Sequence, residues 1–178
     1  MATLFLMVGL PGAGKTTEAR RLAGRHRAVR LSPDEWMIPL FDGLEADGKR
    51  DILEGRLLTI GLEALRAGAD VVVDFGCWGR DERTAIRWLA QSAGGSCRMV
   101  YLPVDPDTQR ARIAHRWATM PHETLPMTED DVLDGHAHFE EPDAAELGGR
   151  TLDAPPLGWA DWHAWAVWRW PSFAWQVA

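Results

Sequence analysis

The feature that most constrains the fold is a glycine-rich segment near the amino terminus, Gly9-Leu10-Pro11-Gly12-Ala13-Gly14-Lys15-Thr16. It matches the pattern G-x-x-x-x-G-K-[S/T] in full. An apolar run at 3–8 precedes it, and a stretch of helical periodicity begins at Lys15. A strand, a glycine turn and a helix in this order form a loop that wraps an anion. The glycines let backbone N–H groups point inward, and the helix N-terminus adds positive partial charge.

The residue types of this segment assign it a phosphate-binding role. Lys15 carries the cation that reaches β- and γ-phosphates, and the Thr16 hydroxyl is suited to coordinating Mg²⁺. We therefore expect Mg²⁺ and either ATP or GTP as cofactors. The chain contains no asparagine, so it lacks the Asn-Lys-x-Asp motif by which GTPases select guanine, and no other base-reading motif is visible. The predicted nucleotide-binding residues are Gly9, Pro11, Gly12, Ala13, Gly14, Lys15, Thr16 and Thr17.

Beyond this segment, short apolar runs alternate with longer stretches of helical periodicity. Such alternation predicts an α/β fold in which a parallel sheet has helices on both faces. At 178 residues the chain has the length of one domain, since domains typically hold roughly 100–200 residues. Expected strands cover 3–8, 28–31, 71–75 and 98–104. Expected helices cover 15–24, 50–67 and 82–93 (the last capped by Asp81), with others after Asp105 and Thr128.

Charge and hydropathy argue against several partners. The formal net charge is −7, whereas nucleic-acid-binding proteins usually present a basic face to the phosphates, so we expect no nucleic-acid partner. No stretch reaches the roughly 20 apolar residues that span a bilayer. The apolar run at the amino terminus is short and lacks a basic leader. We expect a cytoplasmic protein without a membrane segment.

Two acidic residues follow predicted strands at the edge where open α/β sheets bind ligands. Asp34 comes just after the second strand, where a carboxylate can accept the proton of an attacking hydroxyl. The alternative is that Asp34 caps a following helix, and its neighbour Glu35 competes for the catalytic role. Asp74 ends the third strand and is a candidate to hold Mg²⁺ or to bind the acceptor. The alternative for Asp74 is a residue that ends the strand.

Four segments together resemble the small P-loop kinase family that includes chloramphenicol phosphotransferase, zeta toxins and the kinase domain of polynucleotide kinase. They are 4–17, 31–35, 71–76 and Arg112-x-x-x-Arg116, and the similarity covers roughly 1–145. The resemblance implies a P-loop NTPase three-layer sandwich with sheet order 2-3-1-4-5. It also implies transfer of a γ-phosphate to the hydroxyl of a small molecule. Nucleoside-antibiotic self-resistance kinases are family members of similar size, which makes an antibiotic a candidate acceptor.

The resemblance assigns Asp34 as the catalytic base and Arg112 and Arg116 as the lid arginines that clamp the triphosphate. The two arginines are four residues apart and so share one helix face. An arginine at the γ-phosphate spreads the charge that develops during transfer. Arg110 competes for this role, and the alternative for all three is a solvated surface. A lid is expected over 117–139, with its loop closing to exclude water.

Aromatic residues are the remaining candidates for the acceptor site. Trp36 and Trp78 each follow a strand end, and Arg83 lies a few residues after Asp74, so we include all three as substrate-binding candidates. The tail over 159–178 carries six of the ten tryptophans, four of them recurring every third residue. Packing over the sheet edge or a homodimer contact is the simpler interpretation, and an aromatic wall for a planar acceptor is the alternative.

Three hypotheses follow for function. The first is a kinase that acts on a small molecule with a free hydroxyl. The second is a nucleotide-binding switch whose protein partner docks on the tryptophan-rich tail. The third is a nucleic-acid 5′-hydroxyl kinase, which the net charge of −7 disfavours.

Overall fold

The computed structural model describes residues 1–42, 47–120, 124, 126–149 and 152–175. Four strands and eight helices are present in these ranges. In chain order they are β1 Thr3–Val8, α1 Lys15–His26, β2 Val29–Leu31, α2 Asp34–Phe41, α3 Lys49–Arg66, β3 Val71–Gly76, α4 Arg80–Ser92, β4 Ser96–Tyr101, α5 Pro106–Thr119, α6 Glu129–His138, α7 Ala144–Leu147 and α8 Trp162–Arg169.

The four strands form one parallel sheet in the order β2-β3-β1-β4. Leu4 of β1 lies opposite Val71 of β3 on one side and Cys97 of β4 on the other. This confirms the predicted α/β class and the first four positions of the expected sheet order. The described residues contain no fifth strand beside β4. After β4 the chain forms α5 and α6 instead, and the stretch that follows α6 carries three prolines, which donate no backbone hydrogen bonds.

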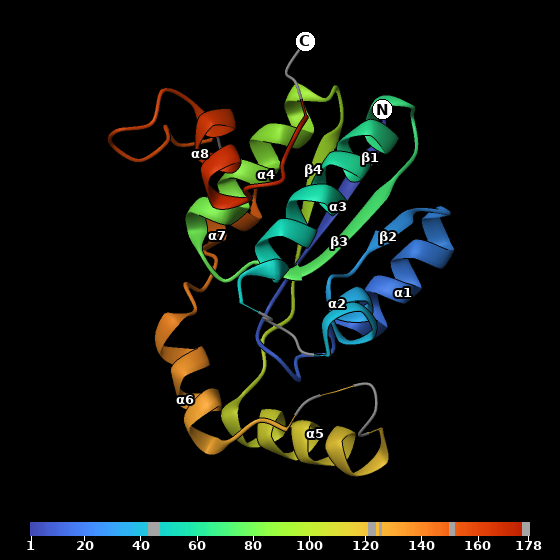
Figure 1. The fold of residues 1–178 in the computed structure, drawn as a ribbon, viewed down its shortest axis with the longest axis vertical. Helices are drawn as coiled ribbons and strands as arrows, with labels where there is room; N and C mark the ends of the chain where they lie inside the picture. Colours follow the sequence, from blue (N-terminus) through green and yellow to red (C-terminus); the bar gives the residue numbers. More distant parts are fainter. Residues whose placement is uncertain (43–46, 121–123, 125, 150–151, 176–178) are drawn as a thin grey trace.

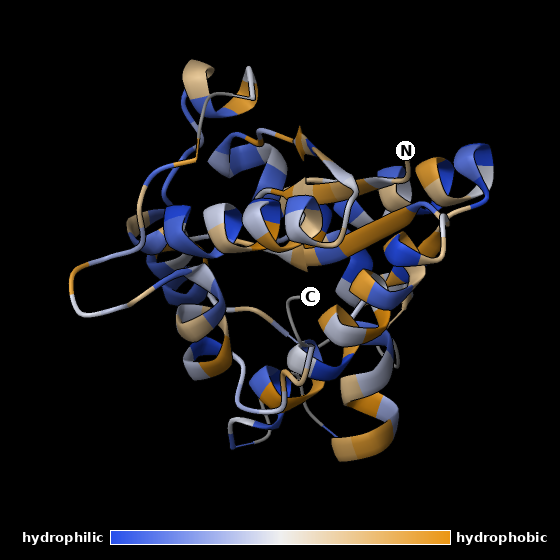
Figure 2. Cartoon of the chain, turned by 90° about the horizontal axis from the view of Figure 1, so that it is seen from above, coloured by the Kyte–Doolittle hydropathy of each residue, from blue (hydrophilic) through white to orange (hydrophobic). Residues whose placement is uncertain are grey.

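Alternating residues of the strands pack into two separate cores, one on each face of the sheet. Leu4, Leu6 and Val8 of β1 pack with α3, α4 and the tryptophan tail, whereas Phe5 and Met7 pack with α1. Successive side chains of a strand point to opposite faces, so both faces of this apolar strand are buried. Figure 2 shows the largely hydrophobic strands at the centre, with hydrophilic residues on the flanking helices.

The carboxyl ends of the strands point toward α5 and α6, and the amino terminus lies at the opposite end of the sheet (Figure 1). Two predicted helix starts are confirmed: Asp105 caps α5, and Thr128 forms a capping box with Asp131 at α6. The predicted cap at Asp81 is wrong, because α4 begins at Arg80, two residues earlier than expected, and its cap is Gly79. The part of the expected lid at 121–123 and 125 lies outside the described residues.

The tryptophan tail packs against helices rather than over the sheet edge. Trp162, Trp165, Trp170 and Trp175 are buried, and α8 lies against α4. Gly55 of α3 permits the closest approach, since a Cβ there would lie 2.7 Å from the Ser172 hydroxyl oxygen. These four tryptophans therefore pack inside the molecule, but against helices and not over the sheet edge that we expected, whereas Trp168 is 60% exposed. Among the described residues, no helix combines the length and apolarity required to cross a membrane.

Candidate active site

The glycine-rich loop connects β1 to α1 at the carboxyl edge of the sheet. Gly9, Gly12 and Gly14 have φ angles of 148°, 78° and 97°, which side chains with a Cβ rarely adopt. The Gly9 N–H donates to the carbonyl oxygen of Gly76 at 3.4 Å, which fixes the loop against the end of β3. Helix α1 begins at Lys15, so its unpaired first-turn N–H groups lie beside the loop. The loop therefore has the geometry expected of an anion-binding cradle.

Gly9→Ala is expected to destabilise the fold. A Cβ at Gly9 would lie 2.7 Å from the Leu102 carbonyl oxygen, which is backbone and cannot rotate away, and the φ of +148° adds strain. We expect a loss of about 1–3 kcal/mol in the free energy of unfolding, or a Tm lower by roughly 2–4 °C per kcal/mol. Gly24→Ala in α1 is the matched control, because nothing lies within 4 Å of its added Cβ. Thermal unfolding of both variants checks this, and equal Tm values would contradict it.

Lys15 is the centre of a group of charges at one end of the cradle. Its Nζ donates to the Leu10 carbonyl oxygen at 2.9 Å. Burial lowers the pKa of Lys15, while the charges of Asp74 and Asp34 raise it and that of Arg116 lowers it. These influences place Asp74, Asp34 and Arg116 each within electrostatic range of Lys15. The structure thus brings together four residues that come from four different elements of the sequence.

Asp74 and Thr16 carry oxygen atoms that could hold Mg²⁺. Asp74 is buried at the end of β3, and this burial raises the pKa of its carboxyl, opposed by the charges of Lys15 and Arg30 and by a hydrogen bond with Thr16. Hydroxyl and carboxylate oxygens are ligands that Mg²⁺ prefers, with phosphate and water completing its shell. Within the described ranges, no cluster of three His, Cys, Asp or Glu could hold a metal by itself. The pair therefore fits Mg²⁺ that arrives with a nucleotide.

Asp34 is the first residue of α2, and its side chain is 57% exposed. The cap position is Pro33, and Asp34 makes no capping hydrogen bond, so the structure does not support the capping alternative. Its carboxylate accepts a hydrogen bond from Arg50 Nη1 at 2.8 Å. Glu35 is instead bound by Arg30 and by Arg20. Asp34 lies close enough to Lys15 for its charge to raise the pKa of the lysine.

The arginines of α5 lie in two different environments. Arg112 Nη1 donates to the carbonyl oxygens of Gly12 and Ala13 at 3.2 and 3.4 Å, so this side chain reaches the cradle. Arg116 lies close enough to Lys15 to lower its pKa. Arg110, the competitor, instead forms an ion pair with Glu129 of α6. The geometry therefore favours Arg112 and Arg116 for contact with a triphosphate.

Trp78 and Trp36 differ in how far they are buried near these charged residues. Trp78 lies between the end of β3 and α6, since added Cβ atoms at Gly76 and Gly135 would lie 3.4 and 3.6 Å from its indole ring. The same Cβ at Gly76 would lie 3.8 Å from Lys15 Cε, which places the ring beside the cradle. Trp36 lies on α2, two residues beyond Asp34, and is 52% exposed.

Arg83 does not face the open site, contrary to expectation. It has no exposed surface, and its guanidinium forms a bidentate ion pair with Glu146 of α7 at 2.6 and 3.1 Å. Its Nη1 also donates to the carbonyl oxygens of Cys77 and Trp78. Cys77 has a φ of 44°, a strained value for a residue with a Cβ. Arg83 therefore stabilises the turn that presents Trp78, and the structure gives no support to direct contact with an acceptor.

The sequence argument missed Arg50 and Glu54, which lie one turn apart on α3. Glu54 is buried and accepts hydrogen bonds from Arg50 Nε at 3.0 Å and from Trp170 Nε1 at 3.1 Å. Its burial raises the carboxyl pKa to about 7, against the opposing charges of Arg50 and Arg169. The only available signal was a charged pair at i and i+4 within an otherwise apolar helix face.

Glu54 is expected to make stability depend on pH. Because its pKa is raised in the folded state, it contributes stability that is present below about pH 4.5 and is lost as pH rises through about 7. Relative to Glu54→Gln, the wild type should lose roughly 3 kcal/mol across this interval, at about 1.4 kcal/mol per pKa unit. Urea unfolding of both proteins at about pH 5 and pH 8 measures the difference. A difference that is the same at both pH values would contradict the assignment.

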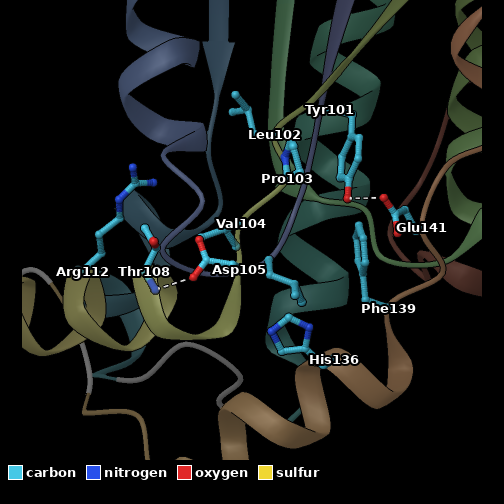
Figure 3. A pocket seen from close by; sticks show the side chains of 11 residues that line it. Tyr101, Leu102, Pro103, Val104, Asp105, Thr108, Arg112, His136, Phe139 and Glu141 are labelled. Atoms are coloured by element: carbon cyan, nitrogen blue, oxygen red, sulfur yellow. Dashed lines mark hydrogen bonds between the residues drawn. The ribbon is translucent and has the colours of Figure 1, made fainter.

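Two hollows lie on the β4 side of the cradle, away from Asp34. One, of about 420 Å³, is lined by Ala13, Gly14, Thr17, Glu18, Leu102 and Arg112. The other, of about 590 Å³, lies between the end of β4, the start of α5 and α6 (Figure 3). Arg112 and Thr108 lie at one end of the larger hollow, and Tyr101 at the other end donates to Glu141 at 2.9 Å. Leu102 and Arg112 line both hollows.

The sheet order, the loop and the helices on both faces define the P-loop NTPase fold, with a loop of the nucleotide-binding type. A family model described as an AAA domain matches residues 4–142, which is more than half of the chain. The chain therefore belongs to this AAA-domain family. A comparison with curated protein sequences finds no match.

Solved structures with the same fold include several described as kinases. A putative kinase from Chloroflexus aurantiacus is 20% identical, with a TM-score of 0.60, and the match covers 94% of this chain and 96% of that one. A gluconokinase from Sinorhizobium meliloti is 18% identical over 80% and 77% of the chains, with a TM-score of 0.54. Kti12 from Chaetomium thermophilum, solved with ADP-AlF3, is 19% identical over 96% and 99%, with a TM-score of 0.60.

Proposed function

We propose that this protein is a kinase that transfers the γ-phosphate of ATP or GTP to a hydroxyl group of a small molecule. The observation that carries the proposal is the convergence of Lys15, Arg116, Asp74 and Asp34 at one end of the cradle. Cations there can neutralise the transferring group, and an exposed carboxylate stands beside them.

The arrangement gives the triphosphate a direction. Lys15 marks the end where the β- and γ-phosphates bind, and this end faces Asp34. The sugar and base then extend to the opposite end, where the hollow of about 420 Å³ is lined by Thr17, Leu102 and Arg112. In this orientation Arg112 serves the nucleoside end and Arg116 the γ-phosphate end.

The residues can carry out an in-line transfer. Asp34 accepts the proton as the acceptor oxygen bonds to the γ-phosphorus, and the bond from that phosphorus to the β–γ bridging oxygen breaks, leaving the nucleoside diphosphate. Lys15 and Arg116 stabilise the charge that develops on the transferring group. Mg²⁺, held by Thr16 and Asp74, would neutralise phosphate oxygens when bound. Trp78 and Trp36 form aromatic surfaces on the acceptor side.

The named relatives suggest where to begin the search for the acceptor. Gluconokinase is among the structures that share the fold, so sugars and sugar acids come first. Nucleosides and hydroxyl-bearing antibiotics follow, because the sequence also resembles antibiotic-modifying kinases. All of these classes offer an alcohol oxygen to an exposed carboxylate.

A screen of acceptors tests the proposal. Wild-type protein with Mg²⁺ and ATP or GTP is incubated with sugars, sugar acids, nucleosides and antibiotics, and nucleoside diphosphate formation is followed. Mass spectrometry of each positive reaction should show an acceptor heavier by one phosphoryl group, and Lys15→Ala is the inactive control. Slow hydrolysis that no acceptor accelerates would argue against the proposal and favour a nucleotide switch.

A further inference from the structure

A continuous set of hydrogen bonds links the C-terminal segment to the candidate base. Trp170 Nε1 donates to Glu54 Oε2 at 3.1 Å, and Arg50 Nε donates to Glu54 Oε1 at 3.0 Å. Arg50 Nη1 then donates to Asp34 Oδ1 at 2.8 Å. Exposure rises along this set, from 1% for Trp170 and 5% for Glu54 to the 57% exposed side chain of Asp34. The set therefore begins in the hydrophobic core and ends at the open site.

The inner end of this set is held firmly. Arg169 binds Asp51 of α3 at 2.6 Å and Glu82 of α4 at 2.6 Å, which fixes the residue next to Trp170 to two helices. Gly55 lets the tail approach α3 so closely that an added Cβ would lie 3.1 Å from Trp170 Cβ. The tail and the first half of α3 are thus packed as one unit.

The ion pair at the outer end of this set, between Arg50 and Asp34, needs a second contact to hold the arginine in place. A single ion pair between an exposed carboxylate and an arginine is weak, because the long side chain loses rotamer freedom to form it. Glu54 occupies Arg50 Nε and leaves Nη1 pointing at Asp34. Removing Glu54 removes a contact that orients the Arg50 guanidinium toward Asp34. Displacement of a catalytic group by about 1 Å can lower a rate by about 100-fold.

We propose that Glu54 is a positioning residue for phosphoryl transfer, which orients Asp34 through Arg50, and that Trp170 links the C-terminal segment to this set of hydrogen bonds. This inference rests on the proposed function, in which Asp34 is the base. The charged groups that face Glu54 are Arg50 of its own helix, Arg169 of the tail and Glu82 of α4. The tail contributes through Trp170, whose hydrogen bond holds the Glu54 carboxylate, and Glu54 in turn binds Arg50.

Hydrolysis of Mg·ATP tests the inference without prior identification of the acceptor, since water replaces the alcohol. Glu54→Gln keeps the shape of the side chain, but the amide nitrogen that replaces one carboxylate oxygen is a donor and cannot accept, so one of the two hydrogen bonds is lost. We expect the rate of phosphate release to fall about 10- to 100-fold in Glu54→Gln. The rate should also fall in Trp170→Phe. Glu63→Gln, an exposed residue of the same helix, is the control and should match the wild type. Thermal unfolding and Mg·ADP binding establish that each variant is folded.

A double-variant comparison separates positioning from a general structural effect. If Glu54 acts through Arg50, adding Glu54→Gln to Arg50→Ala should cause no further loss of phosphate release. A further loss as large as in the wild-type background would overturn the inference. So would folded Glu54→Gln with a wild-type rate, provided that Asp34→Asn is impaired. A wild-type rate for Asp34→Asn itself would instead show that the proposed base, and with it the proposed mechanism, is wrong.

Discussion

Asp34→Asn is expected to lower the rate of γ-phosphate transfer by about 10²- to 10⁴-fold, the usual contribution of a positioned proton acceptor. The substitution keeps the size and polarity of the side chain but removes its ability to take up the hydroxyl proton. Asp34 lies on the first turn of α2 and contacts Arg50. Binding of Mg·ATP to the glycine loop should therefore change little, which separates a catalytic defect from a binding defect.

The control for this prediction is Asp42→Asn. Asp42 is an exposed carboxylate at the other end of the same helix, where α2 is terminated in the left-handed conformation that asparagine tolerates. Its transfer rate should equal that of the wild type. The rate of both variants is measured with the acceptor found in the screen, together with the Kd for Mg·ATP. A rate for Asp34→Asn within a few-fold of wild type would remove Asp34 from the mechanism.

Arg116→Ala is expected to have an effect at least as large, a fall of about 10³- to 10⁵-fold in kcat. Its guanidinium lies close enough to Lys15 to lower the lysine pKa, so it shares the end of the cradle where the γ-phosphate would lie. Charge develops on the transferring group only in the transition state, so kcat should fall far more than nucleotide affinity. Arg116→Lys should restore only part of the rate, because an ammonium lacks the planar fork of donors.

Arg110→Ala supplies the comparison on the same helix. Arg110 forms an ion pair with Glu129 on the surface, and such pairs contribute about 0–1 kcal/mol. The rate of phosphate transfer should therefore stay within a few-fold of wild type. Single-turnover kinetics of the two alanine variants at saturating Mg·ATP measure the difference directly. Equal effects at both positions would show that α5 acts through its net charge alone.

The sequence predicts the sheet and the loop well because each depends on local patterns. Residues 3–8 are apolar except for Thr3 and form β1 with those bounds, and the glycine loop begins at the next residue, Gly9. The residues that follow strand ends converge for a geometric reason, since parallel strands end at the same edge of the sheet. Asp34 and Asp74 therefore lie near Lys15, as their positions in the chain suggest.

What the sequence does not reveal depends on contacts between distant residues. Helix α2 contains Pro39, which normally disfavours a helix interior, and a helix there was considered only as the alternative interpretation of Asp34. Arg83 follows the strand end of Asp74 but turns inward, because Glu146, 63 residues later, supplies a buried carboxylate. The tail shows a repeat of tryptophans, yet the spacing cannot indicate that Trp170 donates to Glu54, 116 residues earlier.

Calorimetric titration of the protein with Mg·ATP tests the central claim most directly, namely that the backbone amides of the glycine loop and Lys15 hold a nucleoside triphosphate. We expect saturable binding with one nucleotide per chain. Lys15→Ala should weaken that binding at least about tenfold, through loss of a charge-assisted hydrogen bond worth about 1.5 kcal/mol or more. Absence of saturable binding to the wild type with either ATP or GTP, or equal affinity in the Lys15→Ala variant, would contradict the account.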